Sequence, residues 1–434
     1  MLFRSGYTMK ASEVLKRLSS GEMIPLLREI YSENIDEQVL RYKEAIQSFM
    51  DYYGDQDIMI FSVPGKCEIG GNHTDHQQGR VLASAIQLDS IGIVGKQNRY
   101  VKVIYNELNI NEIDTENIKY NEAKKGTMES LINGVLFGLN QKNYHIGGFN
   151  AYIQCDIPRN VGLGSSANFN IMIGTIINYL YNEGKIENKY LVQIGRFATN
   201  IFYCKPSGLM NECVCCVGGF IKVDFRDPNS PDIYKLNTDF SNFDYTLCCV
   251  NSNVCRSDNT IDYDAIPKEM IKVANFFKKD VLRDVSYDEF MKNYRIVRAR
   301  VGDRPALRAL HFFKEEDRVL KQTEALEKGD FDTFLKLVRE SGDSTFKALQ
   351  NIYPQESTRH QNIGTAIVLS ENFLGEDGVV KVNGGGFSST MIAFVKTSVI
   401  NDYAAYMDSI FGKGSCYIIH TREQIGRASC RERV

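Results

Sequence analysis

The sequence predicts an α+β protein with two domains and a ligand site between them. Its 434 residues, 43% of them hydrophobic, exceed the roughly 250–300 residues at which a single hydrophobic core stops growing. Short runs rich in β-branched residues alternate with longer helical segments, a pattern typical of mixed folds. Two prolines, Pro228 and Pro231, separate two series of such elements and mark a domain boundary. Small-molecule sites commonly lie at domain interfaces.

The first series begins with a helical lead-in, because residues 10–53 alternate apolar and charged side chains at helical spacing. Short β-branched runs that end in glycine or polar residues predict strands of a mixed sheet at 57–63, 87–95, 100–105 and 149–155. Residues 165–181 are apolar and free of proline, which predicts a buried helix. A further helix is expected at 189–203, followed by a return to strand at 213–225.

The second series predicts strands at 245–251, 379–382 and 390–395, and helices at 267–278, 315–328, 331–339 and 359–373, with a closing helix and strand. We therefore divide the chain into the helical lead-in at 9–55, an N-terminal domain at 56–230 and a C-terminal domain at 231–424. Residues 1–8 precede a second methionine and are expected to be an over-extended start. Residues 425–434 look like translated sequencing-adapter DNA, so we exclude them from the fold as an artefact.

Composition excludes several classes of partner. The formal net charge of −3 and the pI near 6.2 provide no basic surface for nucleic acid. No apolar run reaches the roughly 18 residues that a membrane-spanning helix needs, so we expect no membrane partner.

Eleven cysteines, an odd number in a chain too large for a disulfide scaffold, predict reduced thiols in a cytoplasmic protein. Nothing in the sequence indicates an oligomeric state. Zinc is a weaker alternative to ordinary buried thiols, because no matching CxxC pair accompanies Cys204, Cys213, Cys215 and Cys216.

A glycine-rich element precedes the helix predicted at 165–181, and it reads Gly162-Leu163-Gly164-Ser165-Ser166-Ala167. Unpaired backbone N–H groups and the macrodipole favour an anion at a helix N-terminus, and glycine lets the backbone approach a phosphate closely. The element lacks the Gly-Lys-Ser/Thr of a P-loop. By itself it is equally consistent with a serine that caps the helix after a tight turn. A second element, Gly384-Gly385-Gly386, follows a predicted strand and would by itself most often be a turn.

A polar run follows the first predicted strand and reads Val63-Pro64-Gly65-Lys66-Cys67-Glu68-Ile69-Gly70-Gly71-Asn72-His73-Thr74-Asp75-His76. The vicinal hydroxyls of a hexose need hydrogen-bond donors and planar acceptors, and Asp75 with Asn72 and His73 beside it supplies both kinds. Taken alone, the His-Thr-Asp run could also be a turn closed by an Asx hydrogen bond.

In their order and separation, these three elements resemble those of the sugar kinases in the galactokinase branch of the GHMP kinase superfamily. The resemblance covers nearly the whole chain. It implies a two-domain GHMP kinase fold, with a ribosomal-S5-like N-terminal domain and an α/β-sandwich C-terminal domain around a cleft. It also implies ATP and Mg²⁺ as cofactors, and transfer of phosphate to the anomeric hydroxyl of galactose or a related hexose.

The same resemblance assigns site residues. It implies that the ATP phosphates contact Gly162, Leu163, Gly164, Ser165, Ser166, Ala167, Gly385 and Gly386. It implies Ser166 as a magnesium ligand. The sugar would be bound by Asn72, His73, Asp75, Gly208 and Tyr263. As an isolated residue, Tyr263 would instead be assigned to the core.

The chain departs from the family pattern at several of these positions. Pro206-Ser207-Gly208-Leu209-Met210-Asn211-Glu212 resembles a motif whose aspartate is the proposed base, and Asn211 stands in its place. An amide cannot accept the hydroxyl proton, and loss of a positioned base typically costs about 10²–10⁴-fold in rate. Lys66 replaces the family's arginine and loses its planar fork. Thr199 stands where a glutamate is expected to bind magnesium. Asn72 and Glu212 replace a glutamate and a glutamine.

These observations leave two principal hypotheses. The first is a galactokinase-like, ATP-dependent sugar 1-phosphotransferase. The second is a catalytically impaired paralogue that binds sugar or nucleotide as a sensor, motivated by Lys66, Thr199 and Asn211. A third, another GHMP activity such as a mevalonate or homoserine kinase, is weaker because those relatives lack the full His-Thr-Asp sugar signature.

Overall fold

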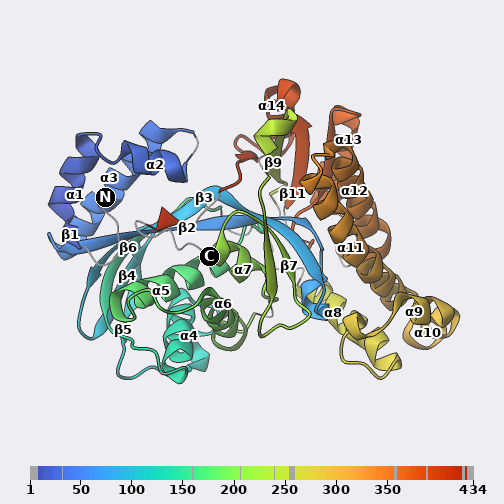
Figure 1. Ribbon diagram of the computed structural model, residues 1–434, viewed down its shortest axis with the longest axis horizontal. Coiled ribbons are helices and arrows are strands. Elements are labelled where there is room, and N and C mark those ends of the chain that lie inside the picture. Colours follow the sequence, from blue (N-terminus) through green and yellow to red (C-terminus); the bar gives the residue numbers. More distant parts are fainter. Residues whose placement is uncertain are drawn as a thin grey trace.

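The computed structural model describes residues 8–31, 33–158, 161–205, 207–238, 240–253, 260–355, 359–387, 390–422 and 426–427. Within these residues the strands form two sheets, one of nine strands and one of four. Figure 1 shows the larger sheet running across the molecule, with helices beneath it and the smaller sheet above its far end. Most of the excluded tail at 425–434, the start at 1–7 and Pro206 lie outside the described residues.

The larger sheet contains β1 (Met9–Lys10), β2 (Asp57–Gly70), β3 (Arg80–Lys96), β4 (Tyr100–Tyr105), β5 (Leu108–Asp114), β6 (Phe149–Cys155), β7 (Phe220–Asp224), β8 (Asp232–Leu236) and β13 (Gly426–Arg427). The strand order along its main path is β1-β2-β3-β6-β4-β5. β7 pairs with β3 and with β8, and β13 pairs with β2. The β4–β6 pair is parallel and the other pairs are antiparallel, which confirms a mixed sheet. β2 continues past its predicted end because a register shift at Pro64 accommodates a residue that cannot donate a ladder hydrogen bond.

Helices cover one face of this sheet (Figure 1). They are α4 (Met128–Gln141), α5 (Ser165–Tyr181), α6 (Asn188–Phe197) with the π-helical turn η3 (Ala198–Phe202), and α7 (Met210–Val217). The predicted helix at 165–181 is confirmed. The predicted strand at 213–225 is wrong in its first half, which belongs to α7. Three buried cysteines of α7 face the core at helical spacing, and Gly218 and Gly219, both with positive φ, end the helix before β7 begins.

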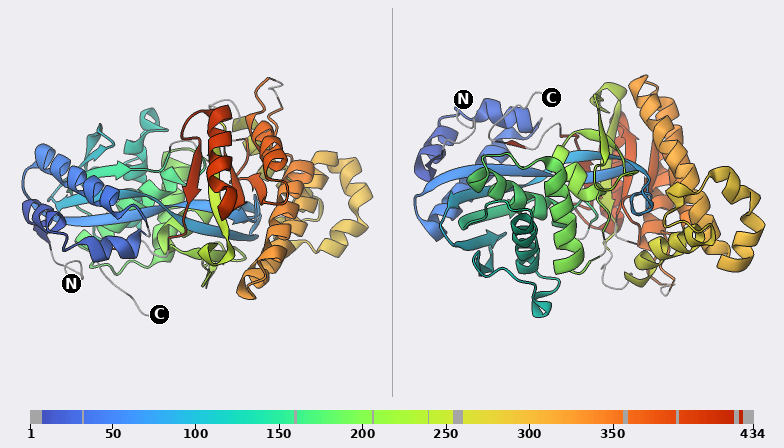
Figure 2. Two further views of the ribbon diagram at one scale, coloured as in Figure 1. Left: turned by 90° about the horizontal axis from the view of Figure 1, so that it is seen from above. Right: turned by 60° about the horizontal axis from the view of Figure 1, so that its bottom comes forward.

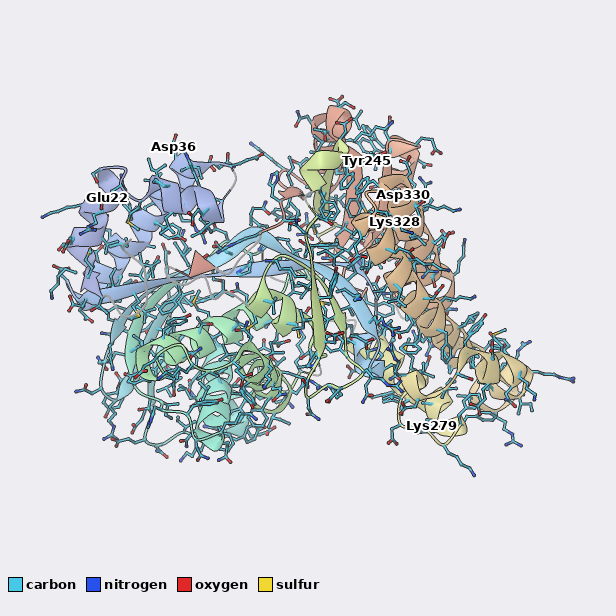
Figure 3. The ribbon with its side chains drawn as sticks, viewed as in Figure 1. Glu22, Asp36, Tyr245, Lys279, Lys328 and Asp330 are labelled. Atoms are coloured by element: carbon cyan, nitrogen blue, oxygen red, sulfur yellow. The ribbon has the colours of Figure 1, made fainter. Side chains whose placement is uncertain are left out.

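The predicted helical lead-in is confirmed as α1 (Ala11–Ser19), α2 (Ile24–Ile30) and α3 (Ile35–Tyr53). Buried side chains of these helices, including Leu18 and Phe49, pack with Ile91 and Ile93 of β3 in one core cluster. Figure 3 labels Glu22 and Asp36 on this layer, which lies at one end of the molecule.

The smaller sheet is antiparallel in the order β10-β11-β9-β12. Its strands are β9 (Tyr245–Asn251), β10 (Gly378–Val382), β11 (Thr390–Lys396) and β12 (Cys416–Ile419). The helices of this half are α8 (Thr260–Phe276), α9 (Tyr287–Lys292), α10 (Tyr294–Val301), α11 (Asp303–Glu327), α12 (Phe331–Ser344), α13 (Asn362–Leu374) and α14 (Ile400–Phe411). Lys328 and Asp330 mark the turn from α11 to α12 (Figure 3). At this turn the ring centroids of Phe331 and Tyr245 are 5.3 Å apart.

Two long strands, β2 and β3, connect the halves. Their far ends contact α11, and the turn between them contacts α8 (Figure 2). β8 continues the larger sheet beyond residue 230. The division of the chain at 56 and 231 therefore stays a prediction, whereas the close contact of both halves around the β2–β3 turn is observed. No helix in the described ranges is long and apolar enough to span a membrane.

A buried carboxylate, Asp89 of β3, joins three parts of the chain. It accepts hydrogen bonds from Arg41 of α3 at 2.7 Å, from Arg422 near the end of the described chain at 2.6 Å, and from Tyr31 at 2.6 Å. Burial opposes its charge, but Arg41 and Arg422 outweigh burial and hold the pKa of Asp89 below its usual range. Stability from this group is present above the unfolded-state pKa and is lost as pH falls through the lower folded-state value.

We expect Asp89→Ala to lower the free energy of unfolding by about 3–5 kcal/mol, because it removes the buried counter-charge that Arg41 and Arg422 share. Urea denaturation at neutral pH measures the change. Asp156→Ala is the matched control: Asp156 also pairs with Arg41, at 2.9 Å, but its side chain is 38% exposed, so we expect a loss of only about 0–1 kcal/mol. Equal losses in the two variants would contradict this account of Asp89.

Candidate functional site

The turn between β2 and β3 carries the predicted sugar-binding residues. Gly71 has φ of 87°, and a side chain there would collide with the backbone at Arg80 and Val81. His73 also has a positive φ, 58°, an uncommon conformation for a residue with a side chain. The short helix η1 (Asp75–Gln77) follows. The turn therefore has a specific backbone shape that its neighbours must hold in place.

Side chains of this turn bind the backbone of the triple-glycine element. Asn72 Nδ2 donates to the Gly384 carbonyl at 2.7 Å, and His73 Nε2 donates to the Gly385 carbonyl at 2.7 Å. With its proton on Nε2, His73 accepts at Nδ1 from His76 Nε2, 3.2 Å away. Burial lowers the pKa of His73 to about 3, so this ring is neutral at physiological pH. The first and third sequence elements are thus joined directly.

A buried polar network lies beneath the turn. Lys381 Nζ of β10 donates to Asn72 Oδ1 at 2.5 Å and to the Ile69 carbonyl at 3.0 Å. Glu315 of α11 accepts from the Gly71 amide at 3.0 Å, and His311 Nε2 donates to the Asn72 carbonyl at 2.9 Å. Both ends of the Asn72 amide group are therefore engaged by protein groups. Sequence reasoning missed Lys381 and Glu315, because a single charged residue in a strand or helix carries no local signal.

Tyr263 of α8 lies against both elements. Its ring centroid is 5.3 Å from that of His73, and a Cβ on Gly385 would overlap the tyrosine ring. Gly385 is therefore required for this packing. The structure places Tyr263 beside His73, and the contact of Tyr263 with the sugar stays a prediction.

Asp75 and Gly208 are brought into contact although 133 positions separate them in the sequence. A Cβ added to Gly208 would overlap the Asp75 carboxylate, whose Oδ1 accepts from the His76 amide at 2.9 Å. Asn211, at the start of α7, is one helical turn beyond Gly208. Its Oδ1 is buried and has no hydrogen-bond partner among the residues that the structure describes. A buried acceptor left unpaired in this way is suited to a ligand hydroxyl.

The predicted phosphate-binding element opens α5. Gly164, with φ of 86°, is the N-cap, and no side chain of the described chain caps this helix. The alternative of a capping serine is therefore not observed, and the first-turn amides of Ser165, Ser166 and Ala167 have no such partner. Leu163 and Ala167 have buried side chains, so only their backbone groups could reach a ligand. The N-terminus of α5 retains the backbone donors that an anion needs.

Lys66 of β2 lies beside this element. Its amide donates to the Leu163 carbonyl at 2.9 Å, and a Cβ on Gly164 would lie 2.8 Å from Lys66 Cγ. A Cβ on Gly384 would lie 3.7 Å from Lys66 Nζ. The Lys66 ammonium group therefore lies between the phosphate-binding element and the triple glycine, where it can neutralise developing negative charge.

Thr199 and Glu212 form a second polar group near the N-terminus of α5. Thr199, in the π-helical turn η3, lies 3.5 Å from Glu212 Oε1, and Asn170 Nδ2 of α5 donates to Thr199 at 2.8 Å. Burial raises the pKa of Glu212 to about 7. Glu212 Oε2 is buried without a hydrogen-bond partner in the described part of the chain. Ser166 precedes Asn170 by four residues and so lies on the same helical face.

The cysteine prediction is consistent with the structure. None of the nine cysteines within the described ranges forms a disulfide bond. Three or more His, Cys, Asp or Glu side chains do not gather at any one point of those ranges. The zinc alternative gains no support.

Comparisons with known proteins agree with this geometry. Residues 47–96 match the galactokinase galactose-binding signature, and residues 130–219 match the N-terminal domain of GHMP kinases. A galactokinase of Streptococcus suis is 27% identical over 361 residues, which cover 80% of this chain and 88% of that protein. A crystal structure of Lactococcus lactis galactokinase complexed with galactose is 20% identical, covers 87% of this chain and 97% of that one, and has a TM-score of 0.75. Methanococcus jannaschii mevalonate kinase has a TM-score of 0.60, with 16% identity, over 85% of this chain and 99% of its own. The predicted fold is confirmed.

We expect Gly208→Ala to weaken hexose binding by about 10- to 100-fold, because the added methyl group displaces the Asp75 carboxylate and hydrogen bonds to charged groups are worth about 1.5–3 kcal/mol. Titration calorimetry measures the dissociation constant, and thermal unfolding verifies that the variant folds. Ser207→Ala, in the same loop, is the control and should bind as the unmodified protein does. Unchanged binding by Gly208→Ala would show that Asp75 does not contact the sugar.

Proposed function

We propose that this chain, a member of the galactokinase branch of the GHMP kinase superfamily, transfers the γ-phosphate of ATP to the anomeric hydroxyl of galactose or a related hexose. It is a kinase of the ATP:sugar class. The observation that carries the proposal is the meeting of three separated elements at Lys66. Lys66 bonds the phosphate-binding element through Leu163, and the side chains of the β2–β3 turn bond Gly384 and Gly385.

Each element has a distinct role in the proposed reaction. Asp75 accepts hydrogen bonds from sugar hydroxyls. Asn72 and His73, whose polar atoms are engaged by Lys381, Gly384 and Gly385, hold the turn so that Asp75 faces the sugar. Tyr263 and Gly208 shape the pocket wall.

The site for the ATP phosphates and the site for the reacting sugar hydroxyl lie on either side of Lys66. The α5 amides and the glycines of both loops hold the ATP phosphates, and Lys66 neutralises charge that accumulates in the transition state. Asn211 orients a hydroxyl through its unpaired Oδ1. Phosphoryl transfer depends mainly on positioning and charge stabilisation, so this arrangement can support turnover without an aspartate at position 211.

Magnesium fits the residues near α5. Hard cations favour carboxylate and hydroxyl oxygens, and Glu212 Oε2 is a buried carboxylate oxygen without a protein partner within the described residues. We propose that Ser166 and Glu212 hold Mg²⁺, with Glu212 supplying the carboxylate that Thr199 lacks. Bound there, the ion would neutralise phosphate charge.

We expect the protein to release ADP in the presence of galactose, Mg²⁺ and ATP, and Asp75→Asn to lower kcat/KM by about 10- to 100-fold through loss of charged hydrogen bonds to the sugar. A coupled ADP-release assay over a panel of hexoses, with calorimetric titration on the same preparation, measures both. Asp36→Asn is the control, because Asp36 is exposed on α3 and its replacement should leave turnover unchanged. Binding without turnover would identify a sensor. The absence of both binding and turnover would refute the sugar assignment.

A reciprocal exchange tests the magnesium ligand. We expect Glu212→Gln to raise the Mg²⁺ concentration for half-maximal activity by about 10-fold or more, since even weaker perturbations of a metal site cost that much affinity. Adding Thr199→Glu to this variant recreates the family's arrangement. The Mg²⁺ concentration for half-maximal activity should then return towards that of the unmodified protein. Binding of a non-hydrolysable ATP analogue as a function of Mg²⁺ provides a readout that does not depend on turnover. An unchanged Mg²⁺ dependence in Glu212→Gln would exclude Glu212 as a ligand.

A further inference from the structure

Glu68 lies between the phosphate-binding and sugar-binding parts of the site. It follows Lys66 by two residues on β2, so the two side chains project from the same face of the strand about 7 Å apart along its axis. Lys66 contacts the phosphate-binding element, and the turn that carries Asp75 begins three residues after Glu68. A Cβ on Gly384 would lie 4.0 Å from Glu68 Oε2 and 3.7 Å from Lys66 Nζ, which places both groups over the same glycine.

Glu68 is buried, and none of the described residues donates a hydrogen bond to its carboxylate. The residue is 4% exposed, and only its backbone amide is bonded, to Asn383 Oδ1 at 3.3 Å. No hydrogen bond or ion pair reaches its carboxylate from the residues that the structure describes. Glu315, also buried, instead accepts from Gly71, Ser341 and Arg318. An unsolvated carboxylate without partners is unfavourable unless a ligand or reaction uses it.

Charged groups on four elements face Glu68. They are Lys66 on β2, Lys381 on β10, Asp75 in η1 and Glu315 on α11. Burial raises the pKa of Glu68 to about 7, while the two lysines oppose that rise and the two carboxylates add to it. A carboxylate tuned in this way can both hold and release a proton near neutral pH.

The other carboxylates near the expected position of the hydroxyl have other proposed roles, Asp75 in sugar binding and Glu212 in magnesium binding. Asp75 accepts from His76 and contacts Gly208 on the sugar side, whereas Glu212 lies beside Thr199. Asn211 offers an amide that cannot take up a proton. Glu68 is therefore the carboxylate beside Lys66 that has no other proposed role, and it lies between the expected positions of the sugar and the γ-phosphate.

We propose that Glu68 is the general base for phosphoryl transfer, replacing the carboxylate that Asn211 lacks; this inference rests on the proposed function. The anomeric oxygen attacks the γ-phosphorus and forms the new O–P bond. The bond from that phosphorus to the bridging oxygen breaks, and its electron pair leaves with ADP. The hydroxyl proton passes to the Glu68 carboxylate and from there to solvent. Lys66 stays protonated throughout.

Glu68→Gln tests the assignment, since glutamine keeps the shape but cannot accept the proton. We expect kcat to fall by about 10²–10⁴-fold, the usual contribution of a general base, with galactose affinity unchanged within about threefold. A base must be deprotonated, so kcat/KM of the unmodified protein, which reports groups of the free enzyme, should decline as pH falls through about 7, the value to which burial raises the Glu68 pKa. This decline at low pH, the acidic limb of the pH–rate profile, should be absent in Glu68→Gln.

Two further variants separate a catalytic role from a structural one. Asn211→Asp, added to Glu68→Gln, places a carboxylate at the alternative position and should recover a large part of the lost rate. Glu212→Gln removes the other carboxylate whose pKa is about 7, and should keep the acidic limb while changing the Mg²⁺ dependence. If Glu68→Gln fails to fold, Glu68→Asp should retain the acidic limb at a reduced rate.

The outcomes distinguish this inference from the proposed function. Turnover by Glu68→Gln within about threefold of the unmodified protein, or an acidic limb that persists in that variant, would overturn the role of Glu68 and leave the kinase assignment intact. If the unmodified protein binds galactose but never forms a sugar phosphate, the proposed function fails first, and the role of Glu68 fails with it.

Discussion

The site depends on a buried set of hydrogen bonds that fixes the β2–β3 turn against the second half of the chain. Lys381 bonds Ile69, Asn72 and Ser341, while Glu315 bonds Gly71 and Ser341. Because these groups are inaccessible to water, breaking any one of them leaves a buried charge or amide unpaired. The turn is therefore held in one geometry, with Asp75 towards Gly208 and with Asn72 and His73 on the triple glycine.

Buried charged groups are also present around the site. The family's aspartate and glutamate are absent at positions 211 and 199, but buried carboxylates are present at 68 and 212. Burial raises the pKa of both to about 7, and Glu212 Oε2 has no hydrogen-bond partner in the described chain. Glu212 lies 3.5 Å from Thr199, so a carboxylate is present beside one of these two positions. Lys66 retains the central positive charge between the two binding elements.

Local sequence patterns predicted some elements well because those patterns were unambiguous. The apolar, proline-free segment at 165–181 is α5, with the same limits. The segment at 213–225 failed because Cys and Val suit a buried helix or strand equally, and only the packing of α7 against α5 decides between them. β2 was predicted to end at 63, since proline and glycine commonly end strands, yet pairing with β3 carries it to Gly70.

The sequence by itself determined the three glycine and polar elements, their resemblance to galactokinase motifs and the residues that depart from those motifs, because each element is a short contiguous run with its own chemistry. Only the tertiary structure decided which of these side chains are engaged with protein and which have no protein partner. Asn72 and His73, both assigned to the sugar, are bonded to Gly384 and Gly385, whereas Glu68 is buried beside Lys66 and its carboxylate accepts no hydrogen bond from the described residues. The contacts of Asn72 and His73 join residues 312 positions apart, and a linear pattern carries no information about burial across such distances.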